Sequence, residues 1–298
     1  MKSEGGPSVS ETDANSSASG VLYIVATPIG NLDDLSTRAV RVLSQADVVA
    51  AEDTRHSGRL LQHLGLSKRL IALHDHNERN RAEGLLRELE GGRSVALISD
   101  AGTPLISDPG YVLVREARNR GLKVSPIPGP CALVTALSAA GLPTDRFLFV
   151  GFLPAKRAGR RAALGRLARE PATLVFYESP HRILDAVADI ASVLGEGRQI
   201  VLGRELTKTF ETFYSGTVDH VLEALSADPH GSKGEFVVMI HGAEAELEED
   251  GEAALDVDRL IKLLLAELPV KKVAKLAAEL SGRPKNELYQ RALELKQE

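Results

Sequence analysis

The sequence has a single cysteine, Cys131, among 298 residues. One thiol excludes an internal disulfide framework and every metal site that needs several cysteines. No stretch of about 18 uncharged apolar residues occurs, so we expect no transmembrane helix and no membrane partner. Residues 1–19 are polar and lack the apolar core of a secretory signal, so we interpret them as a disordered tail. These absences favour a cytoplasmic protein.

Three common catalytic fingerprints are also missing. Without G-x-x-x-x-G-K-[ST], a P-loop nucleoside triphosphatase is disfavoured, and without G-x-G-x-x-G after an early strand, an ordinary dinucleotide or Rossmann methyltransferase site is disfavoured. No G-x-S-x-G elbow is present, so acyl transfer by a serine nucleophile is not supported.

Charge is unevenly distributed along a chain whose net charge is −5. This total is not that of a typical nucleic-acid binder. Residues 156–169 are nevertheless strongly basic, residues 244–252 are acidic, and residues 271–298 carry seven Lys/Arg against four Glu. A basic patch can bind phosphates even on an acidic protein, although solvated helix faces explain such runs equally well.

Apolar segments of strand length alternate with helical patterns through most of the chain. We predict strands at 20–26, 46–51, 69–73, 94–98 and 123–127, and again at 146–150, 173–177, 199–203, 212–215 and 235–240. Near-continuous apolar strands are typical of parallel sheets that are covered on both faces. The fold class is therefore α/β, with two tandem α/β domains and mainly parallel sheets.

The predicted boundaries follow from this alternation. The N-terminal α/β domain spans 20–142, the C-terminal α/β domain spans 143–242, and an acidic linker covers 243–254. Residues 255–298 form a small helical extension, which the breaker Ser281-Gly282-Arg283-Pro284 divides into helix-turn-helix form.

The most informative stretch is the loop 99–110, SDAGTPLISDPG. It follows the apolar run 95–98 and precedes an amphipathic stretch, and its two glycines and two prolines specify its backbone shape. Ligands of open parallel sheets bind at the carboxyl ends of strands. We therefore expect Asp100 and the loop backbone to meet a polar ligand.

Polar side chains also follow other predicted strands. Those at the ends of two early strands are Glu52, Asp53, His56, His74, Asp75 and His76. Their spacing does not match a metal motif, so we interpret them as lining of a polar cleft and predict no metal. Segments 177–182 and 203–212 likewise leave strands with several charges, and helix capping by Ser179 and Pro180 does not explain Glu178, His181 or Arg182.

Taken together, these loops resemble a known family, the tetrapyrrole-methylase-like (class III) S-adenosylmethionine-dependent methyltransferases. The motifs that carry the resemblance, in order, lie at 22–32, 51–55, 99–110, 128–130, 151–154, 176–182 and 204–208. Several spaced motifs in the same order are far more specific than one. Within the family, the chain is similar to members that act on ribosomal RNA.

The resemblance implies a homodimer with the methyl donor S-adenosylmethionine in the cleft between the two α/β domains. It further implies 2′-O-methylation of a cytidine in the decoding region of small-subunit rRNA, with the small ribosomal subunit as partner. The expected donor contacts are Pro28, Asp100, Gly102, Thr103, Pro104, Leu105, Ile106, Ser107, Pro130, Cys131, Ala132, Phe152, Leu153 and Tyr177.

A ribose 2′-hydroxyl is a weak nucleophile, so a general base or a nearby cation would assist its attack. The candidates for this role are Glu178, His181, Glu205, Lys208 and Glu211, and Arg55, Arg182 and Arg204 are candidates for holding phosphates. In the helical extension, the basic residues Lys271, Lys272, Lys275, Arg283 and Lys285 either dock RNA or belong to a packing or dimerisation element.

Two alternatives stay open at this point. The same fold serves methyltransferases that act on small tetrapyrroles, against which the basic segments argue. A non-catalytic nucleotide- or RNA-binding module would share the basic patches but would transfer no methyl group.

Overall fold

The computed structural model describes residues 20–74, 77–244 and 257–297. The chain divides into two compact units, one ending at Ala243 and the other beginning at Glu244. The predicted tail 1–19 and most of the predicted acidic linker lie outside the described residues. In the described part of the chain, no helix is both long and apolar enough to span a bilayer.

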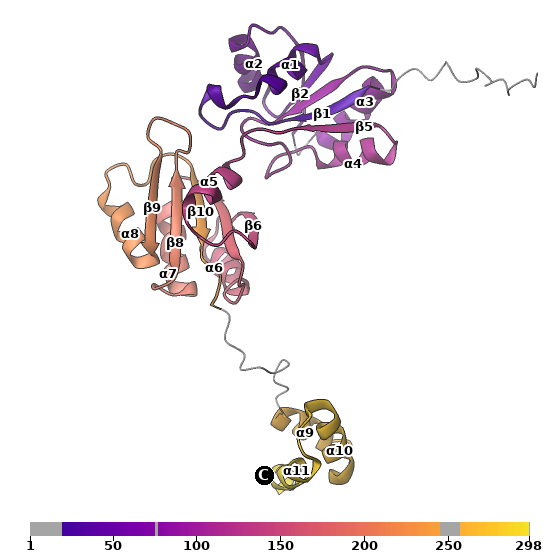
Figure 1. Cartoon of the computed structure of the whole chain (residues 1–298), viewed down its shortest axis with the longest axis vertical. Coiled ribbons are helices and arrows are strands. Elements are labelled where there is room, and N and C mark those ends of the chain that lie inside the picture. The colour runs from indigo at the N-terminus through magenta and orange to yellow at the C-terminus, as the bar shows by residue number, and fades with distance from the viewer. Residues whose placement is uncertain (1–19, 75–76, 245–256, 298) are drawn as a thin grey trace, which may run out of the picture. The chain divides into compact units, whose positions relative to one another are not determined.

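The first unit begins with a wholly parallel sheet in the order β3-β2-β4-β1-β5, as the apolar strands predict. Its strands are β1 (Val21–Val25), β2 (Val48–Ala51), β3 (Arg69–Ala72), β4 (Val95–Ile98) and β5 (Lys123–Ile127). Every residue of β2 and β4 is buried, because helices cover both faces (Figure 1). Helices α1 (Thr37–Gln45) and α2 (Thr54–His63) pack on one face, and α3 (Glu78–Glu90) and α4 (Tyr111–Asn119) on the other.

The second sheet has the order β6-β7-β10-β8-β9 and is mixed. Its strands are β6 (Phe147–Phe152), β7 (Thr173–Glu178), β8 (Gln199–Arg204), β9 (Thr212–Thr217) and β10 (Phe236–Ile240). Only the β6–β7 pair is parallel, and the other three pairs are antiparallel. The short β8–β9 connection cannot make a parallel crossover, and β10 inserts between β7 and β8. The α/β class is confirmed, but this sheet departs from the parallel pattern.

Helices cover the second sheet unequally. On one face lie α6 (Arg157–Arg166), α7 (Ile183–Leu194) and α8 (Val218–Ala227). The other face, which includes Val175, Val201 and Met239, packs against α5 (Ala132–Ala140). Residues 132–140 lie within the predicted N-terminal domain, yet their apolar face is buried by the second sheet. This helix therefore joins the two sheets into one unit.

The second unit contains three helices among its described residues, α9 (Val257–Leu265), α10 (Val270–Ser281) and α11 (Lys285–Gln297). The predicted break is present, and Gly282 ends α10 in the left-handed conformation with φ 68°. A second break precedes α10 at Pro269, because a proline disfavours helical geometry in the residue before it. Ile261, Val273, Ala277, Leu288, Ala292 and Leu295 form the buried core of this unit.

Candidate functional site

A cavity of about 510 Å³ lies where the ends of the two sheets of the first unit meet. This volume is in the range of small-molecule sites. Its lining comprises Ile29, Glu52, Asp100, Ala101, Gly102, Thr103, Ile106, Ser107, Asp108, Cys131, Ala132, Phe152, Tyr177, Glu178, Ser179, Pro180, Leu206, Glu235, Phe236 and Val237. The loop that follows β4 therefore forms one wall, and the second sheet forms the opposite wall.

The loop after β4 is held in an unusual backbone conformation. Gly102 and Thr27 exchange two backbone hydrogen bonds of 2.9 and 3.0 Å, with Gly102 at φ 80°. Leu105 and Ser107 also have positive φ, at 73° and 66°. Such conformations cost non-glycine residues about 1–3 kcal/mol each and gather at ligand sites. The loop shape is thus specified by more than its glycines and prolines.

Asp100 joins this loop to the end of β2. Its Oδ1 accepts a hydrogen bond from the backbone N–H of Asp53 over 3.0 Å, and the residue lines the cavity. Asp53 instead caps α2 and pairs with Arg55 at 2.8 Å. Hydrogen bonds from Arg55 hold the pKa of Asp53 well below its usual value. The neighbouring Glu52 lines the cavity in place of Asp53.

Aromatic side chains form part of the opposite wall. Tyr177 packs edge-to-face against Phe152, with ring centroids 5.8 Å apart, and against Phe149 at 5.0 Å. Its hydroxyl accepts a hydrogen bond from the backbone N–H of Leu133. Burial raises the pKa of Tyr177 far above its usual value, so the phenol stays neutral.

The structure brings together nine of the residues predicted to contact a donor. Those that line the cavity are Asp100, Gly102, Thr103, Ile106, Ser107, Cys131, Ala132, Phe152 and Tyr177. Pro28, Pro104, Leu105, Pro130 and Leu153 stand outside this lining. Pro130 and Leu153 act through their carbonyls, which accept hydrogen bonds from Thr103 and Arg182.

No ligand contact was expected at Glu235 or at the start of β10, where Phe236 and Val237 line the cavity. Ligand contacts were expected at the carboxyl ends of strands, where parallel sheets bind ligands. Because β10 runs antiparallel to β7 and β8, its first residue, Phe236, pairs with Glu178 and Arg204 at their last residues. The expectation of mainly parallel strands therefore pointed to the opposite end of β10.

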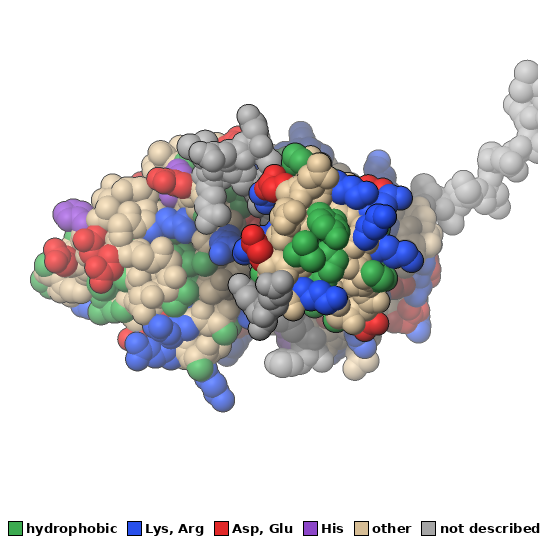
Figure 2. Space-filling view, turned by 90° about the horizontal axis from the view of Figure 1, so that it is seen from below, with side chains coloured by type: hydrophobic (Ala, Val, Ile, Leu, Met, Phe, Trp, Pro, Cys, Tyr) green, Lys and Arg blue, Asp and Glu red, His purple; other side chains and the backbone are tan. Residues whose placement is uncertain are grey.

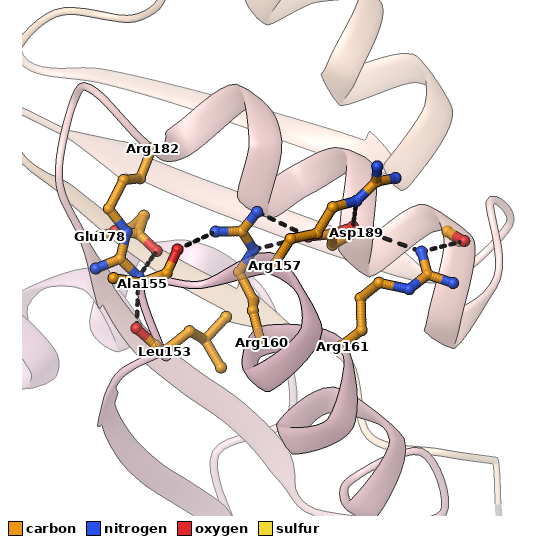
Figure 3. A network of polar contacts seen from close by, with 9 residues as sticks. Leu153, Ala155, Arg157, Arg160, Arg161, Glu178, Arg182 and Asp189 are labelled. Atoms are coloured by element: carbon orange, nitrogen blue, oxygen red, sulfur yellow. Dashed lines mark hydrogen bonds and ion pairs between the residues drawn. The ribbon is translucent and has the colours of Figure 1, made fainter.

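Among the five catalytic candidates, Glu178 lines the cavity. Its side chain is only 1% exposed, and its Oε1 accepts the backbone N–H of Ser179 at 2.8 Å. Its Oε2 pairs with Arg182 at 3.1 Å, and the same guanidinium donates to the carbonyl of Leu153 (Figure 3). A buried carboxylate with a guanidinium partner is suited to accept a hydrogen bond from a ligand.

Glu205 and Lys208 pair with each other near the cavity rim. The Lys208 Nζ lies 2.8 Å from Glu205 and 3.0 Å from Glu235, a lining residue. Burial raises the pKa of Glu205, but hydrogen bonds from Lys208 and the Glu235 backbone lower it more, so it lies below its usual value. Burial lowers the pKa of Lys208, but its carboxylate partners raise it more. Both groups therefore stay charged at neutral pH.

His181 and Glu211 are exposed and stand outside the cavity lining. Glu211 stabilises its own loop, because its carboxylate accepts the backbone N–H of Thr207 over 2.7 Å. The structure does not bring these two residues together with Glu178.

The three arginines considered for phosphate binding differ in exposure. Arg55 has an exposed side chain. Arg204 is 9% exposed, pairs with Asp228 at 3.1 Å and donates to the carbonyl of His230 at 2.7 Å. Arg182 is engaged by Glu178 and Leu153. Arg182 and Arg204 thus make contacts inside the fold, and phosphate binding by any of the three arginines stays a prediction.

No group of three or more His, Cys, Asp or Glu side chains in the described ranges is placed to hold a metal ion. Asp75 and His76, two members of the polar cluster that we considered, lie outside those ranges.

Comparison with known proteins places these features in a family. The chain matches the family Tetrapyrrole (Corrin/Porphyrin) Methylases over residues 21–222 and the RsmI C-terminal HTH domain over residues 251–296. It is 58% identical over 275 residues to Ribosomal RNA small subunit methyltransferase I of Escherichia coli O157:H7, covering 92% of this chain and 95% of that protein. It is 54% identical to the protein of the same name from Pseudomonas aeruginosa, covering 93% and 98%.

Among solved structures, uroporphyrin-III C-methyl transferase from Thermus thermophilus, complexed with S-adenyl homocysteine, shares the fold. It superposes with a TM-score of 0.51 at 21% identity, covering 74% of this chain and 97% of that one. Because its relatives match along nine tenths of the sequence and both units match family descriptions, the chain belongs to the tetrapyrrole methylases and, within them, to the ribosomal RNA small subunit methyltransferase I group.

Proposed function

We propose that this protein transfers the methyl group of S-adenosylmethionine to the 2′-hydroxyl of a cytidine in the decoding region of small-subunit rRNA. The observation that carries the proposal is the identity above 50% with two small subunit rRNA methyltransferases over at least 92% of this chain. The cavity between the two sheets supports it, because it offers a small-molecule site within the matched region.

The residues of the cavity fit this donor. Phe152 and Tyr177 offer aromatic surface for an adenine ring, and Asp100, Asp108 and Glu178 offer negative charge for its cationic end. When bound, S-adenosylmethionine supplies a methyl group that its positive sulfonium already activates. No metal is needed for this chemistry, so alignment and deprotonation of the hydroxyl remain for the protein.

We assign the deprotonation to Glu178. Its carboxylate takes the proton of the 2′-hydroxyl as the oxygen–carbon bond forms and the carbon–sulfur bond breaks. Arg182 keeps this carboxylate oriented. Glu178→Gln should lower the rate of methyl transfer at least tenfold and leave binding of S-adenosylhomocysteine unchanged. The exposed control Glu211→Gln should change neither the rate nor the binding. The same assay applied to single substitutions tests the other four candidates, Glu205, Lys208, His181 and Glu211.

The decisive experiment uses small ribosomal subunits from a strain that lacks the enzyme. Incubation with the purified protein and methyl-labelled S-adenosylmethionine should place one label per subunit, and nucleotide mapping should locate it on a cytidine ribose. Label on a base, or on another rRNA region, would contradict the finer part of the proposal. Absence of label would support a non-catalytic binding module.

The second unit is proposed to dock the RNA. Figure 2 shows apolar and basic side chains on the face of this unit that is in view. Its exposed residues include Leu276 and Leu280 on α10 and the basic residues Lys271, Lys272, Lys275, Arg283 and Lys285. Deleting residues 244–298 should weaken binding to small subunits and leave donor binding intact. Loss of donor binding as well would favour a packing role.

Methylation of a small tetrapyrrole is the alternative. Solved relatives of this fold at about one fifth identity include an enzyme of that kind. The match of the second unit to the RsmI C-terminal HTH domain favours RNA instead. Label transferred to a small tetrapyrrole of the uroporphyrin-III type in the same assay would support the alternative. On this proposal the protein acts in the cytoplasm, and the homodimer stays a prediction that sedimentation can test.

A further inference from the structure

Three arginines of α6 converge on one aspartate of α7 (Figure 3). The carboxylate of Asp189 is 2% exposed and accepts Nε of Arg160 at 2.8 Å and Nε of Arg157 at 3.2 Å. Nη1 of Arg161 approaches the same carboxylate at 3.5 Å. Three cations meet one anion, so the cluster keeps an excess of positive charge.

The three arginine side chains differ in how much of their surface is exposed to solvent. The side chain of Arg160 is 3% exposed and also donates to the carbonyl of Ala155, so it is used inside the fold. The side chains of Arg157 and Arg161 are 75% and 38% exposed. To partners within the described residues, Arg157 donates through Nε and Arg161 through Nη1. The remaining nitrogens of both are available to an outside ligand.

Asp189 remains an anion that orients these groups. Burial raises its pKa, but hydrogen bonds from Arg160 and Arg157 lower it more, so the pKa lies below its usual value. Ser192 adds a second anchor, because its Oγ lies 2.7 Å from Nη1 of Arg161. An anchored guanidinium loses less side-chain freedom when it binds, and its planar fork matches a phosphate.

The cluster is close to the candidate pocket along the chain. Arg157 is the first residue of α6 and follows Phe152, a pocket residue, by five positions. Five residues span at most about 17 Å. Two arginines also hold the intervening loop, since Arg182 donates to the carbonyl of Leu153 and Arg160 to that of Ala155. The backbone of Arg157 therefore lies within about 17 Å of Phe152, and hydrogen bonds fix the loop between them.

We propose that Arg157 and Arg161, oriented by Asp189, bind backbone phosphates of the RNA strand whose target nucleotide enters the pocket. The inference rests on the proposed function and names a contact surface for its substrate. A strand has one phosphate per about 3.4 Å of its axis, so several phosphates fall within the span from pocket to cluster. The amino end of α6, where Arg157 lies, adds a favourable helix dipole for an anion.

The competing explanation is that α6 only presents a solvated basic face. On that view each exposed arginine of the segment would contribute equally to RNA binding. Arg166 is exposed at the other end of α6, about 13 Å along the helix from Arg157. It has the same charge without the Asp189 anchor, and is therefore the matched control.

The experiment measures KM for small subunits lacking the modification, at several salt concentrations. Arg157→Gln with Arg161→Gln should raise KM about tenfold or more and reduce the slope of log KM against log salt by about 1.5, because two phosphate contacts are lost. Arg166→Gln should change KM less than twofold. Arg157→Lys should recover only part of the loss, since lysine lacks the planar fork. S-adenosylhomocysteine binding should stay unchanged.

The proposal would be overturned if Arg166→Gln raised KM as much as the double variant does, or if the double variant left KM unchanged. A fluorescent single-stranded RNA of 20 nucleotides provides a second readout, and the double variant should bind it more weakly than the wild type. Weakening with subunits but not with this RNA would assign the surface to a ribosomal protein instead. Failure of the wild type to methylate subunits would refute the proposed function, whereas the RNA-binding comparison would still test the phosphate site.

Discussion

The hydroxyl of Tyr177 accepts a hydrogen bond from the backbone N–H of Leu133 over 3.1 Å. Leu133 lies in the first turn of α5, where backbone N–H groups have no partner within the helix. The N-cap residue Cys131 makes no side-chain capping bond to any residue that the structure describes. A tyrosine from β7 therefore provides the cap, and this contact ties α5 to the second sheet beside the candidate pocket.

Tyr177→Phe should lower the free energy of unfolding by about 1 kcal/mol, because the N–H of Leu133 loses its partner. Donor binding should change less than threefold, since the ring remains. Tyr177→Ala should weaken S-adenosylhomocysteine binding at least tenfold, because it removes an aromatic wall of the cavity. Urea denaturation and calorimetric titration measure the two effects.

Tyr214→Phe is the matched control. It also removes a hydrogen-bonded hydroxyl, the one that contacts Asp228, but Tyr214 stands outside the cavity lining. Donor affinity should equal that of the wild type. If Tyr177→Ala also bound donor normally, the donor site would have to lie elsewhere.

Gly30→Ala should impair donor binding through a steric clash, because Gly30 is not among the glycines with positive φ. A Cβ at Gly30 would lie 2.4 Å from Cγ of Lys208 and 3.2 Å from the carbonyl oxygen of Leu206. Lys208 is held by Glu205 and Glu235, so the loop carrying Leu206 must shift. We expect S-adenosylhomocysteine affinity to fall about fivefold or more, measured by titration.

A glycine-to-alanine substitution at an uncrowded helical position should instead stabilise the protein. Gly84 lies within α3, and a Cβ there would meet no atom within 4 Å. Gly84→Ala should raise the free energy of unfolding by about 0.5–1 kcal/mol through helix propensity and leave donor affinity unchanged. Comparable affinity losses in both variants would show that the contact at Gly30 is not responsible.

Arg160→Met should destabilise the protein more than Arg161→Met. The first removes a cation that is buried with Asp189, which typically costs about 3 kcal/mol, although Arg157 and Arg161 remain nearby. The second removes a partly exposed pair worth less than about 1 kcal/mol. Urea midpoints and slopes measure both. A smaller effect at Arg160 would contradict the importance of burial.

Acid should destabilise the first unit. The pKa values of Asp189 and Glu205 in the folded protein lie below their usual 3.8 and 4.5. The unfolded chain therefore binds protons at higher pH than the folded chain, so the stability these groups contribute is present above the usual values and is lost as pH falls through the folded values. Urea unfolding between pH 6 and 3 should show this decline below about pH 4.5.

Glu205→Gln should flatten part of that decline, because the group no longer takes up a proton. A stability that rose on acidification would contradict the direction of both shifts.

Local patterns were enough to predict the first parallel sheet and the loop after β4. The predictions failed where partners came from distant segments. Phe236 and Val237 were missed because only pairing with β7 and β8 brings the start of β10 to the cavity. The sequence likewise does not show that Asp228 and His230 accept hydrogen bonds from Arg204, a candidate for holding phosphate.

The sequence by itself determined the alternation of buried strands and amphipathic helices, and the position of the Gly- and Pro-rich loop 99–110. These follow from periodicity and backbone preferences within a few neighbouring residues. Only the tertiary structure decided that β10 lies between β7 and β8 and that α5 packs on the second sheet. It also decided that Asp189 pairs with Arg157 and Arg161, whose side chains stay partly or largely exposed. Those outcomes depend on which distant surfaces bury one another, and no local pattern records that choice.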